Sequence, residues 1–351
     1  MIHETNGNLL RDDAHALVNT VNTVGVMGKG LALQFKRAFP DMFATYASAC
    51  RAGQVQPGVV FPIGLPDGRW VLNFPTKRHW RQPSRLDDIQ SGLDDLVRVI
   101  AELKLQSVAV PPLGCGNGGL PWSQVRSLIM EKLGGLDIDV RLYGPGTPAP
   151  EDMPIATSAP ELTRPRARFM AAASRYIASA WEAGITEEPK ASLLEFHKIA
   201  YLLQSAGLNL GLNFEAGHYG PFSNNLNQAI ASLEGHQLIG FGDGTGGARA
   251  DLRFRPGAAE AAETAIEGDA AFERAWQQLS HAMLGYEYPE GMELLASVHY
   301  LATKTAHPKD PESVAHELAA WSPRKRRLFP ASDAAAAWAR LDEAKLLIPS
   351  S

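Results

Sequence analysis

The sequence predicts an α/β domain followed by a second, mainly helical domain, and three observations lead to this prediction. Short apolar segments alternate with amphipathic segments in residues 1–146. Two glycine-rich loops each follow an apolar segment and precede a helical one. After residue 160 the alternation gives way to long stretches of helical periodicity. A chain of 351 residues, of which 45% are hydrophobic, is long enough to form two packed cores.

The α/β domain is expected over residues 1–146. A strand and a turn are expected in residues 1–13, and short apolar segments predict buried strands over residues 16–18, 59–63, 70–74, 107–110 and 138–143. Leu31, Phe35 and Phe39 recur every four residues, which predicts a helix with these side chains on one face. Residues 86–103 show the spacing of an amphipathic helix, and another helix is expected from Trp122. Such alternation is typical of a sheet with helices on its faces.

Residues 147–160 contain several prolines and are expected to form a linker. The second domain is expected over residues 161–351, with helices over 164–183, 193–206 and 223–233. A turn with aromatic side chains is expected at 217–222, and residues 237–241 and 250–254 predict a small hairpin. From Ala258 onward the pattern is mostly helical.

Charge is unevenly distributed along the chain. Residues 1–150 hold 15 Lys and Arg against 13 Asp and Glu, a net charge of +2, whereas residues 151–351 hold 18 against 25, a net charge of −7. The acidic second half argues against a general nucleic-acid binder there. The basic run at residues 324–327 is expected to contact a partner or nucleic acid, or to form a solvated turn.

Several classes of protein are disfavoured by the sequence. It contains no run of 18 apolar residues and no basic and apolar leader at its start, so we expect a cytoplasmic protein without a membrane partner. Two cysteines, Cys50 and Cys115, do not form a disulfide framework or a zinc site. We expect neither a metal nor a cofactor.

The two glycine loops are the strongest indication of a ligand. The first contains Gly25, Gly28 and Gly30, a spacing that differs from those of both common nucleotide-binding fingerprints. The second extends over residues 112–120. Glycine allows close approach of the backbone, and a following helix directs N–H groups toward a phosphate. Together the loops favour a diphosphate bound between them, although each alone could be a tight turn.

Polar residues near these loops are candidates for recognition and catalysis. Asn19 and Asn22 could bind ribose hydroxyls or act only as turn formers. Lys77 leaves a predicted strand beside Arg78, where it could be an activated nucleophile or a solvated lysine.

The segment after Lys77 has the composition of a nucleic-acid contact. Arg78, Trp80, Arg81 and Arg85 offer cations and an aromatic face suited to single-stranded nucleic acid, unless Trp80 is buried. His79 could transfer a proton or orient a substrate. We expect Cys115 to be a packed thiol, because no activating base is near it in the sequence. We expect Asp87 and Asp88 to be solvated at the start of a helix.

Four segments together give the chain a resemblance to a known family. They are residues 18–22, 25–32, 73–80 and 112–120. In this order they resemble macrodomains, and more narrowly the DarG-type family of DNA ADP-ribosyl glycohydrolase antitoxins, whose partner is the toxin DarT. The second half also resembles the toxin-binding domain of that family. The resemblance implies a three-layer α/β/α macrodomain that binds ADP-ribose.

The resemblance also implies roles for particular residues. Lys77 falls on the catalytic lysine, and Asn22 falls at the distal ribose and joins it in the catalytic set. Asn8 and Leu9 fall at the adenine. The remaining implied ADP-ribose contacts are Asn19, Gly28, Lys29, Gly30, Leu31, Thr76, Gly114, Cys115, Gly116, Asn117 and Gly118. Implied DNA contacts are Arg78, His79, Trp80 and Arg81.

The family reaction hydrolyses the N-glycosidic bond between ADP-ribose and thymidine in single-stranded DNA, releasing ADP-ribose. Lys77 could attack the ribose or protonate the leaving base, and the sequence leaves both roles open. The acidic second half would dock on the cationic groove of the DNA ADP-ribosyltransferase toxin and inhibit it. The alternatives are a non-catalytic ADP-ribose-binding module and a hydrolase of ADP-ribosylated protein or of a small ADP-ribose derivative.

Overall fold

The computed structural model describes residues 1–303 and 309–347 of the chain. Its contacts divide these residues into two units. The first unit contains residues 1–157 together with 242–245, and the second contains the other described residues. The second unit has one hydrophobic core, and the first unit has two. Both glycine loops belong to the first unit.

The first unit is built on one six-stranded sheet. Its strands are β1 (Ile2–Thr5), β2 (Ala16–Asn22), β3 (Phe61–Gly64), β4 (Trp70–Lys77), β5 (Ser107–Val110) and β6 (Asp139–Tyr143). They lie in the order β1-β6-β5-β2-β4-β3, with β3 antiparallel to β4 and every other neighbouring pair parallel. Parallel strands end at a common edge, which brings the residues that follow β2, β4 and β5 together.

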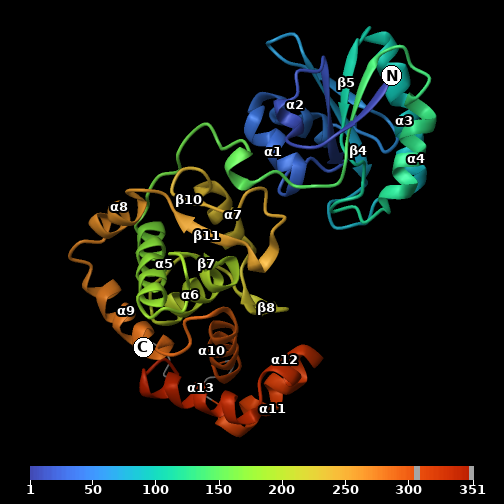
Figure 1. Cartoon of the computed structure of the whole chain (residues 1–351). Coiled ribbons are helices and arrows are strands. Elements are labelled where there is room, and N and C mark those ends of the chain that lie inside the picture. The colour runs from blue at the N-terminus through green and yellow to red at the C-terminus, as the bar shows by residue number, and fades with distance from the viewer. Residues whose placement is uncertain (304–308, 348–351) are drawn as a thin grey trace. The chain divides into compact units, whose positions relative to one another are not determined.

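Helices cover both faces of this sheet. They are α1 (Gly30–Ala38), α2 (Pro40–Arg51), α3 (Leu86–Glu102) and α4 (Trp122–Leu133), with short 3₁₀ turns at Leu9–Arg11 and Pro150–Asp152. Figure 1 shows α1 and α2 on one side of the strands and α3 and α4 on the other. Successive side chains of β2 point to opposite faces of the sheet and so enter different cores of the first unit. Val18 packs with the side chains under α3 and α4, and Leu17 packs with those under α1 and α2. The predicted three-layer α/β/α arrangement is confirmed.

Several details of the first unit differ from the sequence prediction, and β2 continues to Asn22 beyond the expected residues 16–18. Helix α1 ends at Ala38, so Phe39 lies between α1 and α2 and not on the α1 face, and α2 itself was not predicted. Strand β4 continues through Pro75 to Lys77 instead of ending at Phe74. Its pairing with β3 ends at Asn73, and its register with β2 shifts after Val21–Pro75, so the missing N–H of proline is accommodated at a bulge.

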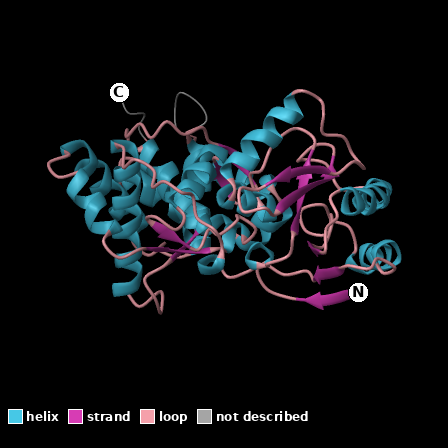
Figure 2. Cartoon of the chain, turned by 90° about the horizontal axis from the view of Figure 1, so that it is seen from above, coloured by secondary structure: helices cyan, strands magenta, loops and turns pink. Residues whose placement is uncertain are grey.

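The second unit is mainly helical, as Figure 2 shows by its colours. Its helices are α5 (Arg164–Glu182), α6 (Leu193–Ser205), α7 (Asn224–Leu233), α8 (Ala258–Ala265), α9 (Ala270–Met283), α10 (Pro289–Ala302), α11 (Pro311–Trp321), α12 (Pro323–Leu328) and α13 (Ala331–Glu343), with a 3₁₀ turn at Gly247–Arg249. Its strands are β7 (Ala191–Ser192), β8 (Glu215–Gly217), β9 (Gly220–Phe222), β10 (Leu238–Ile239) and β11 (Asp251–Phe254).

Two small antiparallel sheets lie among these helices. The predicted hairpin is confirmed, with Leu238 opposite Phe254, and β7 adds a third strand to it. The turn with aromatic side chains expected at residues 217–222 is present: it connects β8 to β9, with Gly217 opposite Gly220. None of the described helices combines the length and the apolar character needed to cross a bilayer.

The basic run at residues 324–327 is neither a turn nor fully solvated, which corrects one of the sequence interpretations. It lies in α12, where Lys325 is completely buried. The Lys325 ammonium donates to the Glu293 carboxylate at 2.7 Å and to the Ser297 hydroxyl at 3.0 Å, and Arg324 donates to the same carboxylate. Half of the run therefore holds α12 against α10 instead of being free for a partner.

Candidate functional site

The predicted site residues gather at the edge of the sheet where β2, β4 and β5 end. Asn22, the last residue of β2, stands opposite Lys77, the last residue of β4, in the strand register. The first glycine loop follows β2, and the second follows β5. Strand β2 lies between β4 and β5 in the sheet. Open α/β sheets bind their ligands at the edge formed by the carboxyl ends of the parallel strands.

Lys77 contacts the second glycine loop directly. Its amine nitrogen donates a hydrogen bond to the main-chain carbonyl of Asn117. Partial burial lowers the pKa of the Lys77 ammonium below its ordinary value. A lowered pKa raises the fraction of neutral amine near neutral pH, and a neutral amine is the nucleophilic form.

Asn117 also approaches the first loop. Its side-chain nitrogen lies 2.9 Å from the point where a β-carbon on Gly30 would stand, and Gly30 has a φ of +65°. Both facts favour glycine at this position, because a side chain would be strained and would meet Asn117. Asn117 therefore connects Lys77 with both loops.

The second loop is a tight, internally bonded turn. Main-chain N–H groups of Cys115, Gly119 and Leu120 donate to the carbonyls of Pro112, Gly116 and Gly114, respectively, at 3.1 Å. Gly116 has open space where its side chain would be, whereas a β-carbon on Gly118 would lie 2.2 Å from the Gly114 carbonyl oxygen. In this loop Gly116 is thus an open glycine position and Gly118 a closed one.

In the first loop, Asn22 holds the turn that leads to the helix. Its side-chain oxygen accepts from the main-chain N–H groups of Val24 at 3.1 Å and Val26 at 3.3 Å, and its side-chain nitrogen donates to the Val26 carbonyl at 2.6 Å. The Tyr46 hydroxyl of α2 donates to the Asn22 main-chain carbonyl. Tyr46 escaped the sequence analysis, because nothing local links α2 to this loop.

The other residues of the first loop differ in exposure. Gly28 and Lys29 are exposed, and Leu31 is half-buried at the start of α1. A β-carbon on Gly28 would touch only the Val26 side chain, at 3.8 Å. Because glycine has no side chain, the exposure of Gly28 means that its backbone is accessible to a ligand.

The predicted contacts Asn19 and Thr76 lie below the surface of the site. Asn19 is completely buried and its side-chain nitrogen donates to the Asn73 side-chain oxygen at 3.0 Å. Thr76 is 4% exposed, and its hydroxyl lies 3.4 Å from the Val21 carbonyl. In this structure both side chains support the strands behind the loops, not the open surface.

Asn8 and Leu9 lie where the chain enters the first 3₁₀ turn. The Asn8 side-chain oxygen caps this turn by accepting from the Leu10 N–H at 3.0 Å, and its nitrogen donates to the Asp152 carbonyl at 2.6 Å. Leu9 is 4% exposed. Asn8 therefore joins the start of the first unit to residues near its end.

The segment after Lys77 carries aromatic and basic side chains, and an ion pair anchors it to α3. The Trp80 side chain is 44% exposed, with the His79 ring stacked on it at a centroid distance of 5.4 Å and the Arg81 guanidinium 4.4 Å above it. The Arg78 guanidinium instead forms two hydrogen bonds with the Asp88 carboxylate, at 2.9 and 3.2 Å. The expectation that Asp88 is solvated was wrong, because this ion pair buries it, whereas Asp87 is exposed.

Cys115 has the character of a packed thiol, as predicted. It is partly buried, and burial raises the pKa of its thiol to about 11. A thiol that remains protonated at neutral pH is a poor nucleophile. Cys115 therefore contributes its backbone to the second loop and not a reactive sulfur.

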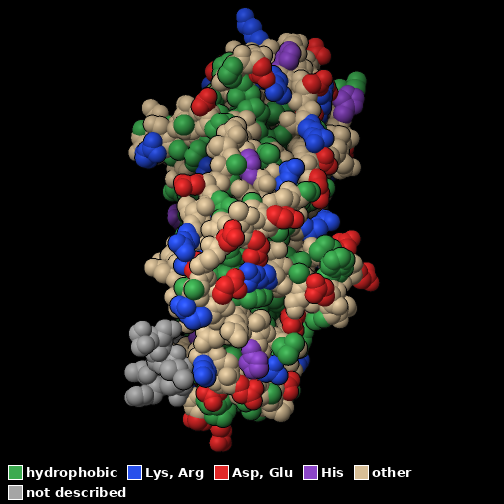
Figure 3. All heavy atoms as spheres, turned by 90° about the vertical axis from the view of Figure 1, so that its left-hand side faces the viewer, with side chains coloured by type: hydrophobic (Ala, Val, Ile, Leu, Met, Phe, Trp, Pro, Cys, Tyr) green, Lys and Arg blue, Asp and Glu red, His purple; other side chains and the backbone are tan. Residues whose placement is uncertain are grey.

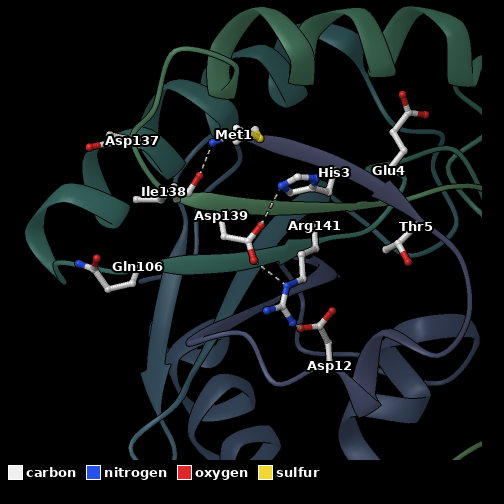
Figure 4. A pocket seen from close by; sticks show the side chains of 10 residues that line it. All are labelled: Met1, His3, Glu4, Thr5, Asp12, Gln106, Asp137, Ile138, Asp139 and Arg141. Atoms are coloured by element: carbon white, nitrogen blue, oxygen red, sulfur yellow. Dashed lines mark hydrogen bonds and ion pairs between the residues drawn. The ribbon is translucent and has the colours of Figure 1, made fainter.

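A hollow of about 770 Å³ lies away from these residues, at the edge where β6 begins and β5 is preceded by Gln106 (Figure 4). The Arg141 guanidinium, which lines it, donates to Asp12 at 2.6 Å and to Asp139 at 2.9 Å. The Tyr143 hydroxyl donates to the same Asp12 at 2.7 Å. These contacts join β6 to the start of the first unit, so we regard the hollow as a structural feature of the opposite edge.

Metal-ligating side chains are not grouped in the described part of the chain: no three His, Cys, Asp or Glu residues there could hold one ion. The site instead consists of backbone amides, one amine and exposed rings.

Comparison with known proteins gives matches over one domain and over most of the chain. Residues 18–129 match the Macro domain family. A protein from Thermus aquaticus named DNA ADP-ribosyl glycohydrolase is 44% identical over 333 residues, which cover 93% of this chain and 89% of the relative. One of the same name from Mycobacterium tuberculosis is 41% identical over 341 residues, with coverage of 94% and 96%.

A further relative joins two activities in one chain. The DNA ADP-ribosyl transferase-DNA ADP-ribosyl glycohydrolase fusion protein of Thermosipho africanus is 38% identical over 157 residues, which cover 40% of each chain.

Proposed function

The chain belongs to the DNA ADP-ribosyl glycohydrolase family, and we propose that it removes ADP-ribose from thymidine bases in single-stranded DNA. The observation that carries this proposal is the Lys77 amine held on the Asn117 carbonyl, between two glycine loops. Exposed backbone in these loops suits a diphosphate, and the amine beside them suits the terminal ribose.

The reaction breaks the bond between the anomeric carbon of the ribose and a nitrogen of the base. Water supplies a hydroxyl to the carbon and a proton to the base. We assign to Lys77 the role of nucleophile: its neutral amine attacks the anomeric carbon as the base departs, and water later releases the lysyl adduct. Burial lowers the pKa of Lys77 and so increases the neutral fraction of the amine that this role requires.

Reductive trapping distinguishes the two roles of Lys77. A lysyl adduct that opens to an imine is reduced by borohydride to a stable linkage, so we expect a covalent ADP-ribose mass on the peptide that contains Lys77. Absence of any trapped mass from an enzyme that turns over in the same buffer would favour acid catalysis instead.

Contact with the DNA is assigned to the segment after Lys77. Exposed aromatic rings bind unpaired bases by stacking, and neighbouring cations bind phosphates. Trp80 and Arg81 offer both groups together, and the Arg78–Asp88 ion pair holds the start of the segment in place. The segment supports single-stranded DNA as the substrate more than a protein or a small derivative.

The substrate is tested by offering alternatives side by side. We expect the protein to release ADP-ribose from a thymidine-modified single-stranded oligonucleotide much faster than from the same oligonucleotide in a duplex, or from a protein ADP-ribosylated on carboxylates. Equal rates on the modified protein would overturn the choice of DNA. Because the proposed substrate is DNA, we place the protein's action in the cytoplasm.

For the second unit we propose binding and inhibition of a partner DNA ADP-ribosyltransferase toxin. Two observations support it: the Thermosipho africanus relative combines transferase and glycohydrolase, and residues 158–241 and 246–351 hold 18 Lys and Arg against 22 Asp and Glu, a net charge of −4, which suits a cationic DNA-binding groove. Figure 3 shows acidic and basic side chains intermingled on the face that it draws, so on that face the charge does not form a single patch.

Inhibition is separated from hydrolysis with the full-length Lys77→Ala variant. We expect this variant to suppress DNA modification by the transferase in a stoichiometric manner while leaving existing modifications intact. Unaltered toxin activity at several-fold molar excess of the variant would show that the second unit does not neutralise the toxin.

A further inference from the structure

Ser84 contacts the second glycine loop but lies outside the residues expected to bind ADP-ribose or DNA. It belongs to the segment between β4 and α3 and is only 6% exposed. Its main-chain N–H donates to the Gly118 carbonyl at 3.0 Å. The segment that carries Trp80 is therefore joined to the second loop at Ser84, as it is joined to α3 at Arg78.

The Ser84 side chain determines which residues the loop can contain. Its hydroxyl oxygen lies 2.2 Å from the point where a β-carbon on Gly118 would stand, and 3.1 Å from the corresponding point on Gly114. The Gly114 carbonyl oxygen lies 2.2 Å from the same Gly118 point. The hydroxyl and this carbonyl are thus neighbours across a position that only glycine leaves open.

Despite this proximity, the Ser84 hydroxyl has no hydrogen-bond partner among the described residues. A buried hydroxyl without a partner destabilises the folded state, so its presence here calls for a reason. Ser107 offers a contrast in the same unit: it is 9% exposed, and its hydroxyl accepts from the His15 N–H at 2.9 Å.

We propose that Ser84 is a positioning residue for the substrate, whose hydroxyl donates to the Gly114 carbonyl once a diphosphate is seated in the second loop. A small movement of the loop toward its ligand closes this hydrogen bond and fixes the loop. Asn117 belongs to the same loop, so the bond also holds the carbonyl that contacts Lys77. This inference rests on the proposed binding of ADP-ribose at the glycine loops.

The test compares stability with binding in the full-length protein. Ser84→Ala removes a buried group that lacks a partner, so the melting temperature is expected to stay unchanged or to rise. The Kd for ADP-ribose, measured by calorimetry, is expected to increase about five- to tenfold, the effect of one lost hydrogen bond. KM for the modified oligonucleotide rises in parallel with little change in kcat. Ser84→Cys, which keeps a weak donor, recovers part of the loss.

Ser107→Ala is the matched control. It leaves the His15 N–H without its partner, so it lowers the melting temperature while Kd and KM stay at wild-type values. An unchanged Kd for Ser84→Ala, with wild-type protein that binds ADP-ribose, would overturn the role of Ser84 alone. If the wild-type protein itself does not bind ADP-ribose, the proposed function fails and the inference with it.

Discussion

The amine nitrogen of Lys77, at the end of β4, donates a hydrogen bond to the main-chain carbonyl of Asn117, 40 residues away in the second glycine loop. This contact joins the proposed nucleophile to the loop proposed to hold the diphosphate. A change in the loop is therefore expected to alter the chemistry of the amine, and the amine in turn is expected to respond to pH.

The rate of hydrolysis is expected to rise with pH and then level off. Burial lowers the pKa of Lys77 below the 10.5 of an exposed lysine, and only the neutral amine attacks carbon. Below the lowered pKa the reactive fraction increases about tenfold per pH unit, and above the pKa it levels off. The measurement is kcat/KM of the full-length enzyme between pH 6 and about 10. A decrease over this range would indicate that the charged form is required.

Gly118→Ala is expected to destabilise the first unit by about 1–3 kcal/mol, the usual cost of forcing a methyl group into a packed site. The new β-carbon would stand 2.2 Å from the Gly114 carbonyl oxygen. Thermal unfolding measures the loss. Gly116→Ala is the control in the same loop, since its β-carbon would have no neighbour within 4 Å, and its melting temperature should match the wild type.

Trp80→Ala is expected to raise KM for the modified oligonucleotide about tenfold, because stacking on one base contributes roughly 1–3 kcal/mol. Its affinity for free ADP-ribose should not change, since the ring lies outside the loops. Steady-state kinetics and calorimetry measure the two quantities. Trp181→Ala, which removes a 51% exposed ring from α5 in the second unit, should alter neither. Equal loss of ADP-ribose affinity in Trp80→Ala would place this ring in the nucleotide pocket.

Asp269→Asn is expected to lower the stability of the second unit at neutral pH by about 1.5–3 kcal/mol. The Asp269 carboxylate is 2% exposed and accepts hydrogen bonds from Arg168, at 2.7 and 3.0 Å, and from Arg164 at 3.1 Å. Arg168 above all holds the pKa of Asp269 well below 3.8, so the ionised form stabilises the fold.

This stabilisation is complete above pH 3.8 and is lost as the pH falls toward the folded-state pKa. Denaturant unfolding at pH 7 and at pH 3 measures this stabilisation. The difference in the free energy of unfolding between wild type and Asp269→Asn should be smaller at pH 3. Asp342→Asn, which changes an exposed carboxylate on α13, should have wild-type stability at both. If this difference in the free energy of unfolding does not change with pH, Asp269→Asn acts through packing and not through charge.

Local patterns predicted the framework of the site well. The glycine loops follow β2 and β5 as expected, and the apolar spacing from residue 86 onward identified α3 with its end displaced by one residue. These features depend on residues near one another in sequence, and glycine spacing or helical periodicity reveals them directly. Helix α2 was not predicted, because only Met42, Tyr46 and Ala49 of its 12 residues are buried and its apolar face is narrow.

Contacts between distant residues were not predictable in this way. Arg78 and Asp88 look like independent surface charges until α3 packs beside β4 and makes them an ion pair. Ser84 has no local pattern at all, since its significance lies in the glycines that it touches about 30 residues later. In the second unit, Lys325 belongs to a basic run that indicates a solvated surface. It is nevertheless buried, because its ammonium pairs with the buried carboxylate of Glu293.

The most direct test of the central claim is single-turnover release of ADP-ribose from thymidine-modified single-stranded DNA by Lys77→Ala. We expect a decrease of at least about 100-fold in rate with unchanged affinity for ADP-ribose, while Lys132→Ala, which removes a lysine of α4 that is paired with Asp94 of α3, keeps the wild-type rate. A Lys77→Ala enzyme that releases ADP-ribose at the wild-type rate would show that the amine on the Asn117 carbonyl does not perform the cleavage.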